Sequence, residues 1–451
     1  MPPELTPEAA AGIREPVTLD IPGDWWDVFL YAGRLYLITL DGDVVEVDWP
    51  RLVESLVGAR EDRLALELSF IDARFLYGRD WERLVRDPEI RALITDKINR
   101  VAAAELIVDS EKLHRSTINS HLQALPEAIS DLDFHRNRIY TASEEGLVRT
   151  ERFELSRNGG QRQWDGEALR LRANAGMLAV AAGVDGLRQS WLRSDGPLEE
   201  PREVLRGDFT GCSWLSTSIY ASSHSNAGAL AVFSQSRRDA ARTGRRAVRR
   251  LEAALDSGTL FDAKQRAKLD EMVRREVAGA EGLREDPPAA DAAPGDGIDI
   301  PEYQSRYADP PEISRRDKGF SWAGHGLICR ADVDAVHIVR YSGKGDLLSR
   351  RLDDLGQLRL NGTEGVTDGD VAPFGVVVET DDDLRVITDD AVYDVGIRPV
   401  RWRTYHRATN YPNHLHVVAS DRVRIISFLN EDMVNFARRR GGFMGRTGRA
   451  R

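Results

Sequence analysis

Short runs of alternating apolar and polar residues recur along the chain, separated by turn-forming residues. The clearest unit begins at Asp27, where DVFLY, RLYLITL and VVEVDW are joined by Ala-Gly and Asp-Gly-Asp. A second unit begins at Asp131 with DLDFH, RIYTAS and LVRTERF, again with a turn of acidic residues and glycine. Each Asp precedes an Arg and a Tyr by the same spacing: Arg34 and Tyr36, then Arg138 and Tyr140. Alternation of this kind predicts half-buried strands joined by tight turns.

Weaker copies of the same three-strand pattern follow. They begin near Leu169, Cys212, Phe320, Pro373 and Tyr411. Most neighbouring copies are separated by a distance close to the ~40–45 residues that one propeller blade occupies. A single unit of this size cannot bury both of its faces, whereas units stacked around a ring cover one another. The repeats therefore predict a mainly β chain arranged as a seven-bladed β-propeller, with six or eight blades as alternatives.

The pattern resembles the WD40-like seven-bladed β-propeller superfamily. The residues that carry this resemblance are the repeated strand pattern and the turns at Asp41-Gly42-Asp43, Glu145-Gly146, Asp185-Gly186 and Asn226-Ala227-Gly228. The Gly-His start and Trp-Asp end of WD40 repeats do not recur, and no specific family is matched. The propeller is expected over residues 17–430. Pro16–Ile21 either completes the last blade beside the strand RVRIISF or forms an outer strand of the first.

The first of two expected insertions covers residues 51–127 and is predicted to be mainly helical. Residues 64–78 show partial alternation that could form a strand pair. Asp87 followed by Pro88 is a typical helix start, and apolar residues then recur at helical spacing up to Leu106. Ser110 could begin a second helix that reaches to about Ala124.

The second insertion covers residues 236–312. Its pattern predicts a helical hairpin followed by a disordered, acidic, Pro/Ala-rich loop. One helix face is rich in arginine, and residues 431–451 form a basic tail that is expected to be flexible. The candidate partner-binding residues are Arg238, Arg242, Arg245, Arg249, Arg438, Arg439 and Arg440. Both insertions follow the third strand of a repeat, so we expect them on the same face of the propeller.

Composition narrows the class of protein only slightly. The chain has 451 residues, 41% of them hydrophobic, and a formal net charge of -11, which disfavours nucleic-acid binding overall. It has two cysteines, Cys212 and Cys329, too few for a disulfide framework or a cysteine-rich zinc site. It shows neither a secretory signal nor an apolar run long enough to span a membrane. These features predict a cytoplasmic protein, and the high Arg and Ala content suggests a bacterial source.

No local catalytic pattern is present: HExxH, GxSxG, CxxC, the P-loop and the dinucleotide fingerprint are all missing. His414 and His416 share one strand face, with His406 nearby, and are interpreted as structural histidines rather than metal ligands. Asp381-Asp382-Asp383 and Asp368-Gly369-Asp370 are interpreted as turn residues rather than a calcium site. No catalytic, cofactor or metal residue is therefore assigned, and no cofactor is expected.

The leading hypothesis is a non-enzymatic scaffold or regulatory subunit that mediates protein–protein interaction through its insertions and tail. One alternative is a hydrolase whose site lies in the central propeller channel, where residues from different blades would converge. Another is a nucleic-acid-associated factor that uses the Arg-rich segments.

Overall fold

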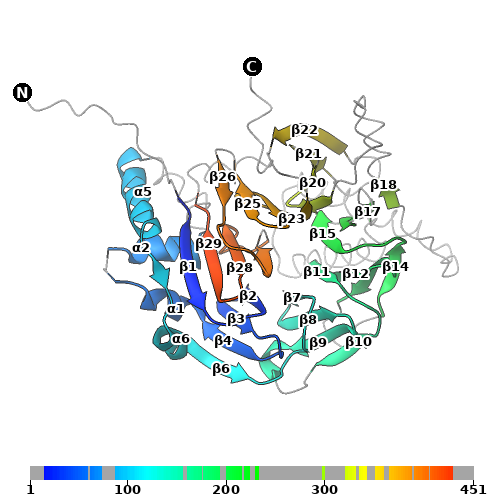
Figure 1. The fold of residues 1–451 in the computed structure, drawn as a ribbon, viewed down its shortest axis with the longest axis horizontal. Helices are drawn as coiled ribbons and strands as arrows, with labels where there is room; N and C mark the ends of the chain where they lie inside the picture. Colours follow the sequence, from blue (N-terminus) through cyan, green and yellow to red (C-terminus); the bar gives the residue numbers. More distant parts are fainter. Residues whose placement is uncertain are drawn as a thin grey trace, which may run out of the picture.

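The computed structural model forms a ring of β-sheets (Figure 1). It describes residues 15–58, 61–73, 87–155, 160–174, 176–192, 200–215, 218–223, 229–232, 297–299, 320–331, 335–342, 351–359, 365–388, 391–405 and 407–429. These residues form seven sheets, six of four strands and one of five. Within each sheet, chain neighbours pair antiparallel and the first strand lies innermost. The predicted mainly β propeller is confirmed.

The sheets are numbered here as blades in chain order, with strands given from the inside outward. Blade 1 contains β2 (Asp27–Tyr31), β3 (Arg34–Ile38), β4 (Val44–Asp48) and β6 (Thr117–His121). Blade 2 contains β7 (Asp131–His135), β8 (Arg138–Ser143), β9 (Gly146–Glu151) and β10 (Gln161–Trp164). Blade 3 contains β11 (Arg170–Asn174), β12 (Met177–Ala181), β13 (Leu187–Trp191) and β14 (Arg202–Leu205).

The other four blades follow the same order. Blade 4 contains β15 (Gly211–Leu215), β16 (Ser218–Ser222), β17 (Ala229–Val232) and β18 (Gly297–Asp299). Blade 5 contains β19 (Ser321–Gly324), β20 (Leu327–Ala331), β21 (Ala335–Ser342) and β22 (Arg351–Arg359). Blade 6 contains β23 (Val366–Ala372), β24 (Gly375–Thr380), β25 (Leu384–Ile387) and β26 (Val392–Asp394). Blade 7 contains β27 (Arg401–Thr404), β28 (His414–Val418), β29 (Arg422–Ser427), β1 (Val17–Pro22) and β5 (Leu106–Ile107).

The last two repeats begin earlier than the sequence pattern indicates. The unit expected from Pro373 starts with β23, and the unit expected from Tyr411 starts with β27. Both missed strands are innermost and polar: VTDGDVA and RWRT carry charged side chains toward the centre of the ring. Because they lack the alternating apolar pattern, they were interpreted as loops or left outside the repeats.

The N-terminal strand closes the ring. β1 pairs antiparallel with β29 along its whole length, from Val17 opposite Ser427 to Pro22 opposite Arg422. Arg424 donates two hydrogen bonds of 2.8 Å to the two carboxylate oxygens of Asp20, and Arg422 adds one of 3.0 Å. Burial raises the pKa of Asp20, but the hydrogen bonds from these arginines outweigh it, so the pKa is lowered. The first of the two expected closure modes is confirmed.

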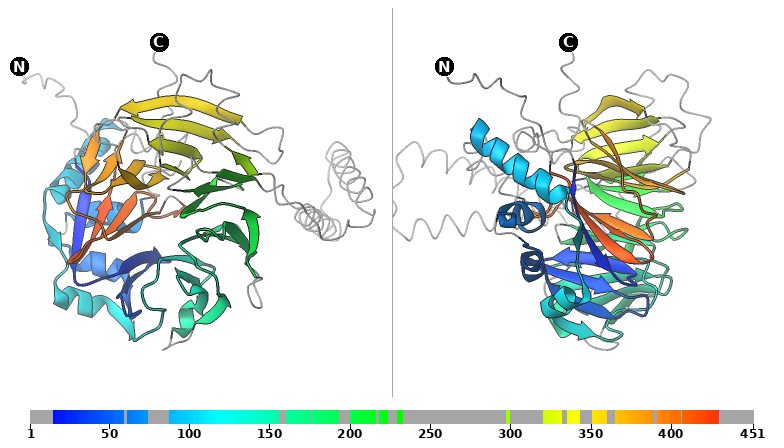
Figure 2. Two further views of the ribbon diagram at one scale, coloured as in Figure 1. Left: turned by 45° about the vertical axis from the view of Figure 1, so that its right-hand side comes forward. Right: turned by 60° about the vertical axis from the view of Figure 1, so that its left-hand side comes forward.

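The first insertion forms helices on one side of the disk, as Figure 2 shows. They are α1 (Trp49–Ser55), α2 (Arg63–Leu66), the π-helix η1 (Glu67–Ile71), α5 (Pro88–Ala102) and α6 (Ser110–Ser116). Asp87 caps α5 by accepting from the N–H of Glu89, as the sequence predicts. The strand pair expected after Leu64 is wrong, because residues 63–71 are helical. The second helix ends at Ser116 rather than near Ala124, and its N-cap is Asp109.

Residues 51–127 do not simply interrupt the propeller. They contain β6, the outermost strand of blade 1, and β5, which pairs in parallel with β1 on the edge of blade 7. Trp49, Leu52, Phe70 and Ile98 are buried in the same apolar cluster as β1 and the strands of blade 1. The insertion therefore seals the seam where the first and last blades meet.

The helical hairpin and acidic loop expected in residues 236–312 lie outside the described residues, except for β18. This short strand pairs with β17 and is the outermost strand of blade 4. Both insertions therefore lie between the third and fourth strands of their blades. The expected tail 431–451 also lies outside the described residues.

Apolar side chains fill the spaces between successive blades. One cluster joins blades 3 and 4 through residues such as Leu187 and Trp214, and another joins blades 5 and 6 through Trp322 and Val376. Glycines in the turns between second and third strands let the segment that leaves the outermost strand pack closely against the turn. Gly42 has a φ of +79°, and a Cβ there would lie 2.1 Å from the carbonyl oxygen of Leu125. The glycine of the Asp-Gly-Asp turn is thus required by both conformation and space.

Antiparallel strands give the disk two faces. The helix face carries the turns that follow each innermost strand, such as Ala32-Gly33 and Arg136-Asn137, together with the helices of the first insertion. The N–H of Trp49 donates to Gly33 O and that of Arg152 to Asn137 O, which joins the insertion and the next connection to these turns. The opposite face carries the turns between second and third strands, such as Asp41–Asp43.

Candidate functional site

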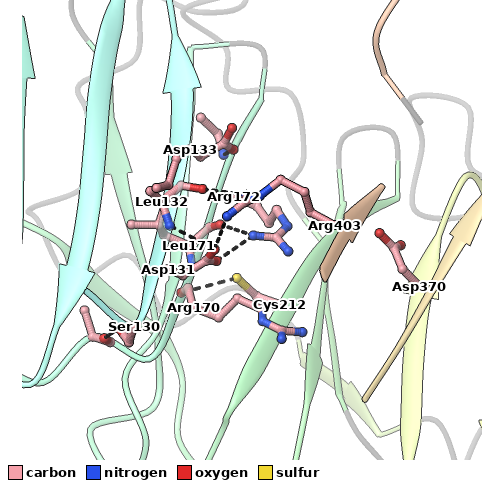
Figure 3. Close-up of polar contacts among 12 residues, drawn as sticks. Ser130, Asp131, Leu132, Asp133, Arg170, Leu171, Arg172, Cys212, Asp370 and Arg403 are labelled. Atoms are coloured by element: carbon pink, nitrogen blue, oxygen red, sulfur yellow. Dashed lines mark hydrogen bonds and ion pairs between the residues drawn. The ribbon is translucent and has the colours of Figure 1, made fainter. Parts of the chain in front are cut away.

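The innermost strands bring nine charged side chains to the centre of the ring, and Figure 3 shows those around Asp131. We call this set the central cluster, and it comes from blades 1, 2, 3, 6 and 7. Its members are Asp27, Asp131, Asp133, Asp368, Asp370, Arg170, Arg172, Arg401 and Arg403. Burying so many ionic groups costs free energy unless each is paired or hydrogen-bonded, so their partners decide what the centre can do.

Arg403 joins three blades. One of its terminal nitrogens donates to both oxygens of Asp27, at 2.9 and 2.8 Å, and lies 3.7 Å from a carboxylate oxygen of Asp131. Its other terminal nitrogen donates to the carbonyl oxygen of Leu132 at 3.0 Å. The guanidinium also stacks on the ring of Phe29 at 4.8 Å. Asp27 is 1% exposed, so this arginine supplies the charge that a buried carboxylate needs.

Two carboxylates of β7 fasten blade 2 to blade 3. Asp131 accepts from the Leu171 N–H at 3.0 Å and from Arg172 at 2.6 Å. Asp133 accepts from the Ala173 N–H at 2.7 Å, and no guanidinium hydrogen bond to it is found among the described residues. Burial raises the pKa of both groups; in Asp131 the nearby arginines outweigh it and the pKa is lowered, whereas in Asp133 the pKa stays raised.

An ion pair crosses the ring between blades 3 and 6. Both terminal nitrogens of Arg170 donate to Asp368, one of them at 2.8 Å, which is the bidentate geometry of a strong guanidinium–carboxylate pair. Beside it, Asp370 accepts from the hydroxyl of Thr404 at 2.6 Å and thereby links blades 6 and 7. Asp368-Gly369-Asp370 was expected to form a turn; it instead lies in β23 with both acids in the central cluster. The second acidic run, Asp381–Asp383, does lie in the turn between β24 and β25.

Every carboxylate of the central cluster accepts a hydrogen bond from a backbone N–H, a hydroxyl or a guanidinium. A hydrolase with paired carboxylates needs one group free to take or give a proton next to substrate. The carboxylates do converge, as the hydrolase hypothesis requires, but their hydrogen bonds and ion pairs join neighbouring blades. We call this set of contacts the ionic clamp.

A second polar set is buried in the seam between blades 7 and 1, and it is neutral. The Leu30 N–H donates to the Tyr405 hydroxyl at 3.0 Å, which lies 3.0 Å from His416 Nδ1. His416 Nε2 lies 3.4 Å from His414 Nδ1, and His414 Nε2 lies 2.8 Å from the Ser69 carbonyl oxygen. With both imidazoles protonated on Nε2 alone, every contact in this series of hydrogen bonds pairs a donor with an acceptor.

We call Tyr405, His416, His414 and the Ser69 carbonyl the seam relay. Burial lowers the pKa of His414 to about 4 and that of His416 well below its ordinary value, so both rings are neutral at pH 7. The relay ties blade 7 to β2 of blade 1 and to the π-helix of the insertion. The predicted shared strand face is confirmed, and the histidines are hydrogen-bonded within the core. His406 lies outside the described residues.

The helix face carries a surface patch over blades 1 and 2. Phe153, in the 3-10 turn η2 (Arg152–Glu154), is 76% exposed. The Arg152 guanidinium lies 5.0 Å from the centroid of its ring and 5.4 Å from that of Tyr31. Arg152 also donates to Asn137 Oδ1 at 3.2 Å and to the Tyr36 hydroxyl. An exposed aromatic ring held on a fixed guanidinium is typical of protein-binding surfaces.

Two further arginines of the helix face lie against the end of β11. Arg407 donates to the carbonyl oxygens of Ala173 at 3.0 Å and Trp214 at 3.4 Å. Arg136 is exposed, and a terminal nitrogen of its guanidinium lies 3.8 Å from where a Cβ on Gly176 would stand. Burial lowers the pKa of Arg407 to about 10; burial also lowers that of His135 to about 4, with Arg136 and Arg407 adding to the effect.

The described residues of the opposite face are mostly acidic. Their turns and connections expose many carboxylates and few cations. The exposed acids are Asp24, Asp41, Glu127, Glu144, Glu145, Asp165, Glu167, Asp185, Asp208, Asp381, Asp382, Asp394 and Asp421, and the exposed arginines are Arg162, Arg206 and Arg398. The described helix face, by contrast, exposes side chains of both signs, such as Glu89, Arg91, Asp96 and Arg100 of α5.

The candidate residues assigned from the sequence, Arg238, Arg242, Arg245, Arg249, Arg438, Arg439 and Arg440, lie outside the described residues. The central cluster and the patch on the helix face were missed. Asp27 and Asp131 stand at the same place in the two clearest repeats, which was the one available signal, but their partners come from distant blades. Both cysteines are buried and free, and burial raises the pKa of Cys212 to about 12.

In the described part of the chain, no His, Cys, Asp and Glu side chains are grouped in threes or more so as to hold a metal ion. None of the described helices has the length and hydropathy needed to cross a membrane.

Comparison with known proteins yields structural likeness only. No protein-family model matches the chain, and no curated protein matches it in sequence. Among solved structures it is similar to the β-propeller domain of Cps50 (Swd1) from Myceliophteria thermophila, with 9% identity and a TM-score of 0.47 over 92% of this chain and 100% of that one. It is also similar to BamB from Moraxella catarrhalis (9% identity, TM-score 0.37, 88% and 80% covered) and to Hsv2 from Kluyveromyces lactis (9%, 0.37, 90% and 91%).

Proposed function

We propose that this β-propeller is a non-enzymatic scaffold or regulatory subunit that binds a protein partner through its helix face. The observation that carries the proposal is the exposed ring of Phe153 held on Arg152, in a ring whose central charges are already paired. Aromatic residues and arginine dominate the binding energy of protein interfaces, since they bury a large area while keeping few conformations. A lone exposed valine, by contrast, is ordinary on a protein surface.

Charge indicates which kind of partner fits. The surface patch on the helix face carries arginine, which attracts an acidic molecule. The carboxylates of the opposite face would repel one. An acidic surface on the partner is therefore favoured. The free, buried cysteines are compatible with a reducing compartment, and we propose a cytoplasmic location on that basis. We also keep the arginines of residues 238–249 and 438–440 as proposed additional contacts with the partner.

Purification of the full chain from its native host tests the proposal. The wild-type chain is expected to retain a stoichiometric partner, which is then identified and reconstituted from purified components. Phe153→Asp should abolish the complex, because it places a buried charge at the interface centre. The matched control is Val184→Asp, since Val184 is 81% exposed but lies on the opposite face.

Failure to recover any stoichiometric partner with the wild-type chain would contradict the scaffold function. A complex that survives Phe153→Asp but is lost with Val184→Asp would show that the interface lies on the opposite face and not on the helix face. Deletion of residues 437–451 tests the tail separately, and binding of nucleic acid that is lost with this deletion would favour the nucleic-acid hypothesis instead.

A further inference from the structure

We infer that Arg136 and Arg407 form a carboxylate-binding site on the helix face, which takes acidic side chains of a peptide segment of the partner. The inference rests on the proposed function and names the chemistry of the partner. It depends on three features of the described residues: positive charge that no ion pair balances, the guanidinium of Arg407 held by hydrogen bonds, and a strained turn that carries the exposed Arg136.

The positive charge of this region is not neutralised by ion pairs. Among the described residues, neither Arg136 nor Arg407 has a carboxylate within ion-pair distance, and the same holds for the neighbouring Arg152. Asp133 lies below Arg407 and favours its charged form, but both oxygens of that carboxylate already accept backbone N–H groups. A carboxylate arriving from outside would therefore meet guanidinium groups that still lack an anionic partner.

Hydrogen bonds hold Arg407 in place before any ligand binds. Arg407 reaches from blade 7 to carbonyl oxygens of blades 3 and 4, which use some of its five N–H donors and leave the others available. Arg136, in the β7–β8 turn of blade 2, lies beside the equivalent β11–β12 turn of blade 3, at Gly176. His135 lies between these cations on β7, and its Nε2 is buried without a hydrogen-bond partner. A ligand therefore meets donors whose ordering cost is partly met by the fold.

The turn that presents Arg136 is strained. Arg136 has a φ of +52° and Asn137 one of +62°, the left-handed region that asparagine and glycine adopt at lower cost. The equivalent turns of blades 1 and 5 hold Ala32 and His325 in the same conformation, at φ values of +50° and +47°. The conformation therefore belongs to this type of turn, and in blade 2 it places an exposed arginine at the turn.

A peptide fits these observations better than a nucleic acid. A polyphosphate backbone needs an extended track of cations, but here Glu151 and Glu154 flank the patch and thirteen exposed acids cover the opposite face. The exposed Phe153 beside the cations offers an apolar contact to a side chain that follows the acidic residues. The favoured ligand is thus a short segment with glutamate or aspartate next to an aromatic or aliphatic residue.

Fluorescence anisotropy of the full-length protein tests the inference with three labelled probes. The first is a capped peptide of alternating glutamate and tryptophan, the second has glutamine in place of each glutamate, and the third is single-stranded DNA. We expect the glutamate peptide to bind, and Arg136→Asn to weaken it roughly tenfold or more, since a charge-assisted hydrogen bond is lost. Arg206→Asn makes the same charge change on the opposite face and should alter the affinity less than twofold.

Equal binding of the glutamine peptide, or unchanged affinity in Arg136→Asn, would overturn the inference, as would DNA that binds more tightly than the peptide. Because asparagine suits the turn conformation, a loss of binding in this variant cannot be assigned to unfolding, and circular dichroism checks this directly. The two proposals fail in distinguishable ways. A partner complex that is lost with Phe153→Asp but unaffected by Arg136→Asn keeps the scaffold function and removes only the carboxylate site.

Discussion

The centre of the ring and the seam between blades 7 and 1 bury polar groups in two different ways. At the centre the groups are charged and most of them are paired: Arg403 pairs with Asp27, which is 1% exposed, and Arg170 pairs with Asp368, whose side chains are 31% and 17% exposed. In the seam, His414 and His416 are 0% exposed and neutral. The comparison shows two ways of burying polar groups: charges at the centre are held by opposite charges and hydrogen bonds, whereas the seam uses neutral groups that need no counter-ion, as the cost of burying ions requires.

The largest expected effect comes from breaking the central cluster. Arg403→Met removes the hydrogen-bonded counter-ion of the buried Asp27, leaving only Arg401 at 3.9 Å, and should lower the free energy of unfolding by about 3–5 kcal/mol. The control is Arg34→Met, which removes a half-exposed pair with Asp48 and should cost about 1 kcal/mol or less. Urea unfolding of both variants measures the difference, and equal losses would show that the centre is no stronger than a surface pair.

Acid should break the seam before the centre. The pKa of His414 is about 4 in the folded chain against an ordinary value of 6.5, so protonation favours the unfolded chain. Its contribution to stability is complete above about pH 6.5 and falls by about 3 kcal/mol as the pH drops to 4. Asp20 and Asp131 have lowered pKa values in the folded chain, so their protonation should lower the stability only below about pH 3.8, their ordinary pKa.

Unfolding free energy measured from pH 7 to pH 4 tests this order. His414→Gln should flatten the slope over that window, although it also lowers stability at pH 7. A slope that is unchanged in this variant would mean that the seam relay is not the source of acid sensitivity.

A smaller change sharpens the role of the seam relay. Tyr405→Phe removes one hydroxyl and leaves both the Leu30 N–H and His416 Nδ1 without a partner, which should cost about 2–3 kcal/mol. Tyr411→Phe removes a hydroxyl that donates to the carbonyl of Leu30 and also has a backbone hydrogen bond from Ala32, but it leaves no imidazole without a partner and should cost about 1 kcal/mol. Thermal unfolding of the two variants compares them, and an equal loss would show that the relay adds nothing beyond a single bond.

The smallest expected effect on stability comes from substituting Arg136, which lies outside the central cluster. Arg136 forms no part of the ionic clamp, and its turn is strained. Arg136→Asn should therefore raise the unfolding free energy by about 0.5 kcal/mol, while changing binding. A clear loss of stability would mean that Arg136 has a structural role and belongs with Arg403.

The sequence predicts the blades well where the apolar pattern is intact, as in β2–β4 and β7–β9. It fails at β23 and β27 because those strands face the charged centre and lose the alternation on which the prediction depends. It also misses β6 and β18, since an insertion separates each from the strand it pairs with. A short strand that is distant in sequence from its partner leaves no local signal.

The candidate sites were harder to predict for the same reason. Arg403 and Asp27 lie at opposite ends of the chain, and Arg170 pairs with Asp368 across the ring. Only ring closure brings these residues together. The seam histidines were predictable from their spacing on β28, but their partner, the Ser69 carbonyl, belongs to a helix that was expected to be a strand.

The central claim is that the charges at the centre hold the ring, whereas binding takes place on the helix face. A double-mutant cycle on the pair that crosses the ring tests it most directly, with Arg170→Met, Asp368→Leu and their combination. Each single variant should lose about 2 kcal/mol or more of unfolding free energy. The double variant should regain most of that loss and bind the partner as the wild-type chain does. A double variant that is stable but no longer binds the partner would contradict the account, because it would place the functional site at the centre of the ring.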